Sequence, residues 1–115
     1  MLPKTIKKRT VFLEVSQSGS STRTRSVISV CKRILDGDSL VGYTASRKVG
    51  NAVSRNFAKR RLRSLVREFS SEIVGGFVFV FIATRKTVEI GFSELRADFI
   101  YSLRKSKENE FRNAK

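Results

Sequence analysis

The sequence contains no histidine, one cysteine, one proline and no apolar run of about 18 residues. Without histidine, imidazole-based acid–base catalysis, histidine–metal clusters and hydrolase triads are excluded. We expect no membrane-spanning helix, and the first ten residues lack the apolar segment of a secretory signal. Cys31 has no partner for an internal disulfide, which favours a reducing cytoplasm, and we interpret it as a small core or strand residue.

Acidic residues are also scarce, and positive charge dominates the composition. The chain has 24 Lys and Arg against 10 Asp and Glu, which gives a net charge of +14. Such a chain repels itself and needs a polyanionic partner, most often a nucleic acid. An apolar content of 40% with nine Phe residues suffices for one small core. We therefore expect a single domain over residues 1–115, with frayed ends at 1–5 and 106–115.

Hydrophobic periodicity predicts the order helix, strand, strand, helix, strand, helix. The expected helices cover residues 7–18, 51–71 and 93–105, and the expected strands cover residues 25–33, 40–47 and 75–85. The Asp-Gly pair at 36–37 predicts a hairpin between the first two strands, and residues 18–23 are expected to form a turn or a short extended piece. The third strand should be buried on both faces. The fold class is α+β, with about four strands packed by three helices.

The segment "AVSRNFAKRRLRSLVRE", residues 52–68, is predicted to form a helix with two opposed faces. A narrow apolar stripe should dock on the sheet. Opposite it, an arc of about 140° carries Arg55, Asn56, Lys59, Arg60, Arg63 and Arg67. No acidic residue occurs from 40 through 67, whereas a solvated helix face normally mixes both signs of charge. We interpret the arc as a polyanion-binding face, and its arginines favour a structured nucleic acid over a fluid lipid surface.

The stretch "SRKVGNAVSRNFAKRRLR", residues 46–63, resembles the signature of the bacterial ribonuclease P protein subunit. That signature is a K-x-G-x-A-V turn followed by R-N-x-x-K-R-x-x-R, and the order of elements fits from Arg9–Phe12 to the last helix. The resemblance implies a left-handed βαβ crossover that carries the basic helix. It also implies RNA-binding residues at Ser46, Arg47, Lys48, Asn51, Arg55, Asn56, Lys59, Arg60, Arg63 and Arg67, and leader-binding residues at Lys8, Arg9 and Phe12.

The resemblance implies a function as well. Proteins of this family join a catalytic RNA, and the holoenzyme removes the 5′ leader of precursor tRNA in the bacterial cytoplasm. The RNA performs catalysis with Mg²⁺ that is bound mainly by the RNA. The expected partners are therefore the catalytic RNA and precursor tRNA, with no membrane and no small-molecule substrate. The polypeptide itself is expected to contribute no catalytic residue and no metal site.

Two departures from the family pattern stand out. Phe57 occupies a place where a second Arg is common, and it either stacks on a base or packs at the rim of the helix. The family lines a cleft for the leader with aromatic residues, of which Phe12 matches one. The next helical turn has Ser16, and the matching strand position is expected at Ser29 or a neighbour. Phe12 binds the leader or belongs to the core.

Three other functions fit the sequence less well. A nuclease acting alone needs a cluster of carboxylates, and the only close pair, Asp36 and Asp38, is better explained as a turn. A ribosomal or other structural RNA-binding protein would share the charge but not the motif, and it remains the alternative. A membrane-surface protein is disfavoured because no lipid-facing apolar stripe is present.

Overall fold

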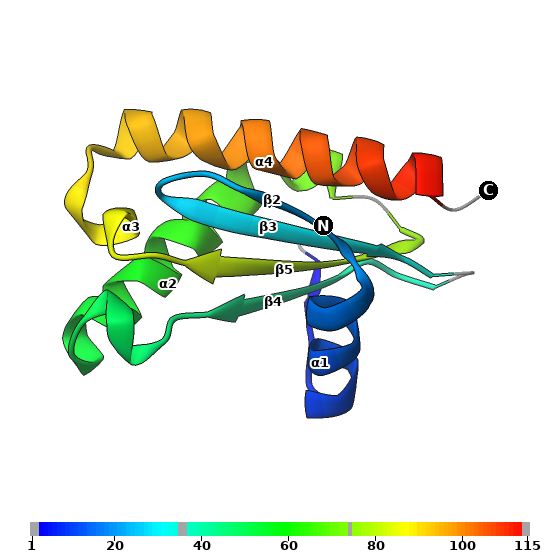
Figure 1. Cartoon of the computed structure of the whole chain (residues 1–115), viewed down its shortest axis with the longest axis horizontal. Helices are drawn as coiled ribbons and strands as arrows, with labels where there is room; N and C mark the ends of the chain where they lie inside the picture. The colour runs from blue at the N-terminus through cyan, green and yellow to red at the C-terminus, as the bar shows by residue number, and fades with distance from the viewer. Residues whose placement is uncertain (1–2, 35–36, 74, 114–115) are drawn as a thin grey trace.

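The computed structural model describes residues 3–34, 37–73 and 75–113, which form a mixed sheet covered by helices on both faces (Figure 1). The strands are β1 (Lys4–Thr5), β2 (Ser20–Arg23), β3 (Val27–Arg33), β4 (Leu40–Thr44) and β5 (Phe77–Ala83). The α-helices are α1 (Arg9–Ser18), α2 (Ala52–Glu68), α3 (Lys86–Glu89) and α4 (Phe92–Asn113), and the 3₁₀ turns are η1 (Arg47–Val49) and η2 (Ser70–Glu72). The α+β class is confirmed, with five strands and four α-helices among these residues instead of about four and three.

β5 occupies the centre of the sheet, whose strand order is β1-β4-β5-β3-β2. It pairs antiparallel with β3 and parallel with β4, so that Val80 lies between Val30 and Gly42. The predicted hairpin is therefore wrong, because β5 separates the two strands expected to pair; Asp36 of its turn lies outside the described residues. The parallel pair with α2 between its strands confirms the βαβ crossover.

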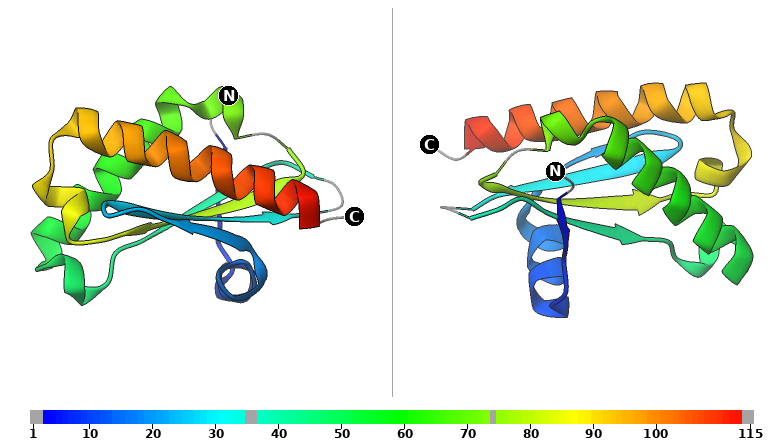
Figure 2. Two further views of the ribbon diagram at one scale, coloured as in Figure 1. Left: turned by 45° about the horizontal axis from the view of Figure 1, so that its top comes forward. Right: turned by 180° about the vertical axis from the view of Figure 1, so that it is seen from behind.

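The two faces of β5 carry different side chains and pack against different helices. Phe77, Phe79 and Phe81 enter the core beneath α2 and α4, where the rings of Phe81 and Phe99 lie 4.8 Å apart. Val78 and Val80 pack on the opposite face against Val15 of α1. Figure 2 shows α1 alone on its side of the sheet. The expectation that this strand is buried on both faces is confirmed.

Within the described residues, parts of both segments that were expected to fray form regular structure. Lys4 and Thr5 pair in parallel with Leu40 and Val41, which makes the edge strand β1. α4 continues through residues 106–113 because its polar side chains bind the β2–β3 edge of the sheet. There the buried carboxylate of Glu110 accepts hydrogen bonds from Ser20 Oγ at 2.8 Å and from the backbone N–H of Arg33 at 2.9 Å.

Serine hydroxyls fix α4 against β3. Ser29 points toward α4, with its Oγ 2.6 Å from Ser102 Oγ, and Ser106 Oγ donates to the Ser29 carbonyl at 2.7 Å. All three serines are fully buried. The expectation that Ser29 or a neighbour marks the leader cleft is therefore wrong for Ser29 itself, which lies on the opposite face from α1.

Phe99→Ala should lower the free energy of unfolding by about 3–5 kcal/mol, because it opens a cavity beside the ring of Phe81. Tyr101, on the exposed side of the same helix, is the matched control, and Tyr101→Ala should change stability by about 0.5 kcal/mol or less. Urea unfolding followed by circular dichroism measures both. Equal midpoints for the two variants would contradict the assignment of Phe99 to the core.

Candidate nucleic-acid interface

α2 is held to the sheet by its apolar stripe. Ala58, Leu62, Leu65 and Val66 are buried, as the helical wheel predicted, and Phe69 stacks on Phe99 with ring centroids 6.1 Å apart. The residues on the opposite side that face solvent are Asn56, Arg60, Arg63 and Arg67, while Arg55 and Lys59 are half-buried. The helix therefore holds a row of cations on a rigid support; we call Arg55, Asn56, Lys59, Arg60, Arg63 and Arg67 the basic stripe.

The turn that begins α2 places further cations beside the basic stripe. Asn51 is the N-cap, as predicted, and its Oδ1 accepts a hydrogen bond from the backbone N–H of Ser54 at 2.9 Å. Gly50 has φ of 145°, a conformation that favours glycine. Val49 is buried and anchors η1, which leaves Ser46, Arg47 and Lys48 exposed. The structure thus brings all ten predicted RNA-binding residues into one continuous region of η1 and α2.

Most carboxylates of the described residues bind cations outside the basic stripe. Glu72 accepts two hydrogen bonds of 2.9 Å from Arg104, which hold its pKa below the ordinary value, and Glu94 and Asp98 both bind Arg25. Glu68, the last residue of α2, turns to Arg96 of α4. Within the described part of the chain, no carboxylate lies within 4.0 Å of a cation of the basic stripe. The acids nearest the stripe, Glu68 and Glu72, are thus occupied by arginines of α4, and the cations of the stripe are left for an external anion.

Phe57 packs at the rim of α2, around an arginine that the sequence analysis did not single out. The Arg61 guanidinium lies 4.9 Å from the Phe57 ring centroid and 5.6 Å from that of Phe92. Its Nη1 also donates to the carbonyls of Thr87 at 2.9 Å and Ile90 at 2.8 Å, at the end of α3. Arg61 therefore fastens α2 to the turn between α3 and α4. The one sign of this role in the sequence is that Arg61 lies outside the polar arc of the helix, although it is charged.

The predicted leader-binding residues lie together on the α1 side of the sheet. Lys8, Arg9 and Phe12 line a hollow of about 290 Å³ that reaches Thr44 at the end of β4. Phe12 is half-buried and lies over Gly42, where an added Cβ would come within 3.1 Å of its ring. Phe12 thus contributes to packing and to the surface of this hollow at the same time.

A second hollow, of about 490 Å³, lies where the strand ends meet η1. Its floor is the cross-strand pair Ile28 and Ile82, and its rim carries Arg23, Lys48 and Arg85. The strand position next to Ser29, where the family pattern often has an aromatic residue, is therefore occupied by the aliphatic side chain of Ile28. Ser16, at the other expected aromatic position, is exposed on α1. Arg23 and Arg85 were missed because a single cation at a strand end has no distinctive spacing.

The described residues contain no cluster of three side chains among Cys, Asp and Glu that could hold a metal ion. Nor does any helix among them have the length and apolarity to cross a bilayer. The side chains of η1 and the basic stripe offer hydrogen-bond donation and positive charge.

Comparison with known proteins gives a consistent result. Residues 3–107 match the family model described as Ribonuclease P. The chain is 38% identical over 102 residues to the "Ribonuclease P protein component" of Geobacillus kaustophilus, covering 88% of this chain and 84% of that protein. It is 39% identical over 92 residues to the protein of the same name from Symbiobacterium thermophilum, covering 79% and 80%.

Solved structures of similar proteins share the fold. The RNase P protein from Thermotoga maritima superposes with a TM-score of 0.72 at 26% identity, covering 85% of this chain and 93% of that one. A mutant of the Staphylococcus aureus RNase P protein, described as defective in mRNA degradation activity, superposes with a TM-score of 0.80 at 24% identity, covering 90% and 87%.

The neighbours Arg60 and Arg61 should respond to mutation in opposite ways. Arg61→Ala should lower the free energy of unfolding by about 1–3 kcal/mol, because it removes two hydrogen bonds from a charged donor to backbone carbonyls. Arg60→Ala, which removes an exposed side chain of the stripe, should leave stability within about 0.5 kcal/mol. Thermal and urea unfolding test both variants. Equal losses of stability would show that Arg61 does not fasten the helices.

Proposed function

The chain belongs to the family of ribonuclease P protein components, and we propose that it joins a catalytic RNA to remove the 5′ leader of precursor tRNA. Membership makes it part of an endoribonuclease holoenzyme with an RNA partner. The catalytic RNA and precursor tRNA as its two RNA ligands, and the bacterial cytoplasm as its location, are parts of the proposal.

The observation that carries the proposal is the basic stripe without carboxylate partners. Like-charged residues one helical turn apart, such as Arg55 and Lys59 or Arg63 and Arg67, repel each other by about 0.2–0.5 kcal/mol per pair without a counterion. Phosphates relieve this repulsion, and guanidinium groups bind them with two parallel hydrogen bonds. Since the stripe is straight and rigid, it suits the regular phosphate spacing of a folded RNA.

The two faces of the sheet are proposed to bind two different RNA ligands. The basic stripe, with η1, binds the catalytic RNA. The hollows on the α1 side bind the single-stranded leader, with Phe12 available for stacking and Lys8 and Arg9 for phosphates. Lys48 lines the second hollow and also belongs to η1, so the two ligands would meet near this residue. The aliphatic floor formed by Ile28 and Ile82 allows contact with bases of any sequence.

The polypeptide positions RNA and contributes no group to bond cleavage. The described residues have no carboxylate cluster that fits a metal ion. In this proposal Mg²⁺ is held mainly by the RNA, where it supplies the chemistry of hydrolysis. The protein lowers the Mg²⁺ requirement because its cations replace part of the counterion charge that two packed RNAs need.

Cleavage of precursor tRNA by the catalytic RNA should become faster, and should need less Mg²⁺, when this protein is added. The assay compares initial rates at low Mg²⁺ for the RNA alone, the protein alone and the two together. Cleavage by the protein alone would overturn the proposal. Binding without any change in rate would favour the alternative, a structural RNA-binding protein without a role in cleavage.

The double variant Arg60→Ala with Arg63→Ala should keep the fold and weaken binding to the catalytic RNA. The slope of log affinity against log salt should become shallower by about 1.4–1.8, because each lost phosphate contact contributes about 0.7–0.9. Lys105→Ala with Arg112→Ala removes the same charge from α4 and is the control. Filter binding over a range of salt concentrations measures the slopes. An unchanged slope for the stripe variant would contradict its assignment.

A further inference from the structure

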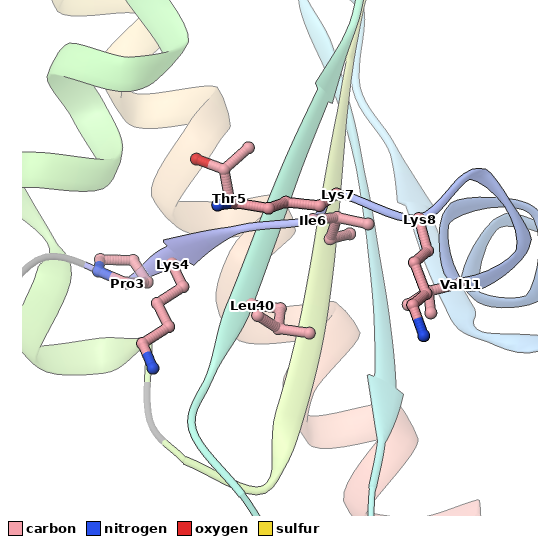
Figure 3. Close-up of a pocket in the computed structure, with 8 residues that line it drawn as sticks. All are labelled: Pro3, Lys4, Thr5, Ile6, Lys7, Lys8, Val11 and Leu40. Carbon is pink, nitrogen blue, oxygen red and sulfur yellow. The ribbon is translucent and has the colours of Figure 1, made fainter.

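β1 lies between two hollows of different character. On the α1 side, Ile6, Val11 and Leu40 line a largely apolar hollow of about 660 Å³ (Figure 3). On the α2 side lies a much smaller notch, which Thr5 of β1 also lines. Figure 3 shows the Thr5 hydroxyl directed away from Val11 and toward α2. We call this second space the β1–α2 notch.

The β1–α2 notch has a volume of about 140 Å³. It is lined by Pro3 and Thr5 of the N-terminal segment, Tyr43 of β4, and Arg63, Val66 and Arg67 of α2. Small-molecule sites occupy about 300–1,000 Å³, so the notch is too small for a nucleoside or a cofactor. A space of this size suits one compact polar group.

Every polar side chain around the notch can donate a hydrogen bond. Arg63 and Arg67 lie one helical turn apart on α2, and the Arg63 guanidinium stacks 5.5 Å from the Tyr43 ring centroid. Within the described part of the chain, the side chains of Thr5, Tyr43, Arg63 and Arg67 make no hydrogen bond or ion pair. Four donors thus line one space without a protein acceptor, and two of them carry a positive charge.

Tyr43 is suited to donate to an anion. Burial raises its pKa to about 12, while the positive charges of Arg63 and Arg67 act in the opposite direction. The phenol therefore keeps its proton at neutral pH. Both arginines line the same notch as the phenol, and the Arg63 guanidinium lies over its ring.

We propose that the β1–α2 notch binds one phosphate group of the RNA backbone, with Tyr43 and Thr5 as contacts in addition to Arg63 and Arg67. This inference rests on the proposed function, because it takes the occupant from the RNA that the basic stripe binds. An RNA backbone is favoured since the notch continues the stripe at Arg63 and Arg67. The N-terminal strand thereby becomes part of the RNA interface.

The test uses the two tyrosines of the chain as a matched pair. Tyr43→Phe and Tyr101→Phe each remove one hydroxyl and no charge, and Tyr101 is exposed on α4, outside the notch. Tyr43→Phe should weaken binding to the catalytic RNA about tenfold at every salt concentration, because it removes a hydrogen bond to a charged group. Its salt slope should equal that of the unchanged protein, and Tyr101→Phe should bind like the unchanged protein.

Two further variants distinguish the contribution of the uncharged hydrogen-bond donors from that of positive charge. Thr5→Val should weaken binding in the same salt-independent way, whereas Arg67→Ala should weaken binding and also reduce the slope by about 0.7–0.9. Circular dichroism confirms that each variant is folded. If Tyr43→Phe and Tyr101→Phe both bind like the unchanged protein, the phosphate contact at the notch is excluded.

A second measurement tests the notch without RNA. The chain has no tryptophan, so in the Tyr101→Phe variant the only tyrosine emission comes from Tyr43. Inorganic phosphate should change this emission with saturation, and chloride at equal ionic strength should not. If the unchanged protein fails to bind the catalytic RNA, the proposed function is wrong, yet saturable phosphate binding would still support an anion site. No response of this emission to phosphate would likewise count against an anion site at the notch.

Discussion

Burial of β5 on both faces is the constraint on which the rest of the structure depends. β5 alternates Phe and Val over residues 77–81 and is apolar throughout, so it needs a hydrophobic layer above and below it. Placing it at the centre of the sheet satisfies this need and forces β3 and β4 to opposite sides of it. α2 must then cross over to connect β4 with β5, and it packs its apolar stripe on the Phe face. The direction in which the basic stripe points is thus a consequence of core packing.

The distribution of charge follows from the same arrangement. α4 lies beside α2 on the Phe face, and acids at Glu68 and Glu72, at and just after the end of α2, pair with Arg96 and Arg104. Exposed pairs of this kind add little stability, about 0–1 kcal/mol each. Their larger effect is to occupy the acids near the stripe, so that its cations remain without carboxylate partners in the described part of the chain.

The sequence predicted elements best where the signal was periodic and local. The two faces of α2, its N-cap at Asn51 and the double burial of β5 were all predictable from side-chain spacing. The pairing of β3 with β4 was not, because an Asp-Gly turn signal cannot reveal that a later strand inserts between its two neighbours. β1 was missed because two exposed residues held by backbone pairing have no hydrophobic pattern. The end of α4 was placed too early because Ser106 and Glu110 are polar yet buried.

The candidate site divides in the same way. Exposed residues of one helix face were predictable, since a single helical wheel contains all of them. The hydrogen bonds of Arg61 to Thr87 and Ile90 could not be predicted, because a long flexible side chain can reach carbonyls that lie far along the chain. Nor could the β1–α2 notch, which assembles residues from three separate segments around Tyr43. Its partners are neighbours only once the sheet has formed.

The serine contacts between β3 and α4 have a consequence for the uniqueness of the fold. An apolar helix can slide along an apolar sheet by a fraction of a turn with little change in free energy. The hydroxyls of Ser102 and Ser106 are spaced one turn apart, and both bind Ser29. Any slip would leave buried hydroxyls without partners, at about 1–3 kcal/mol each. These hydrogen bonds therefore fix the axial position of α4 on the sheet.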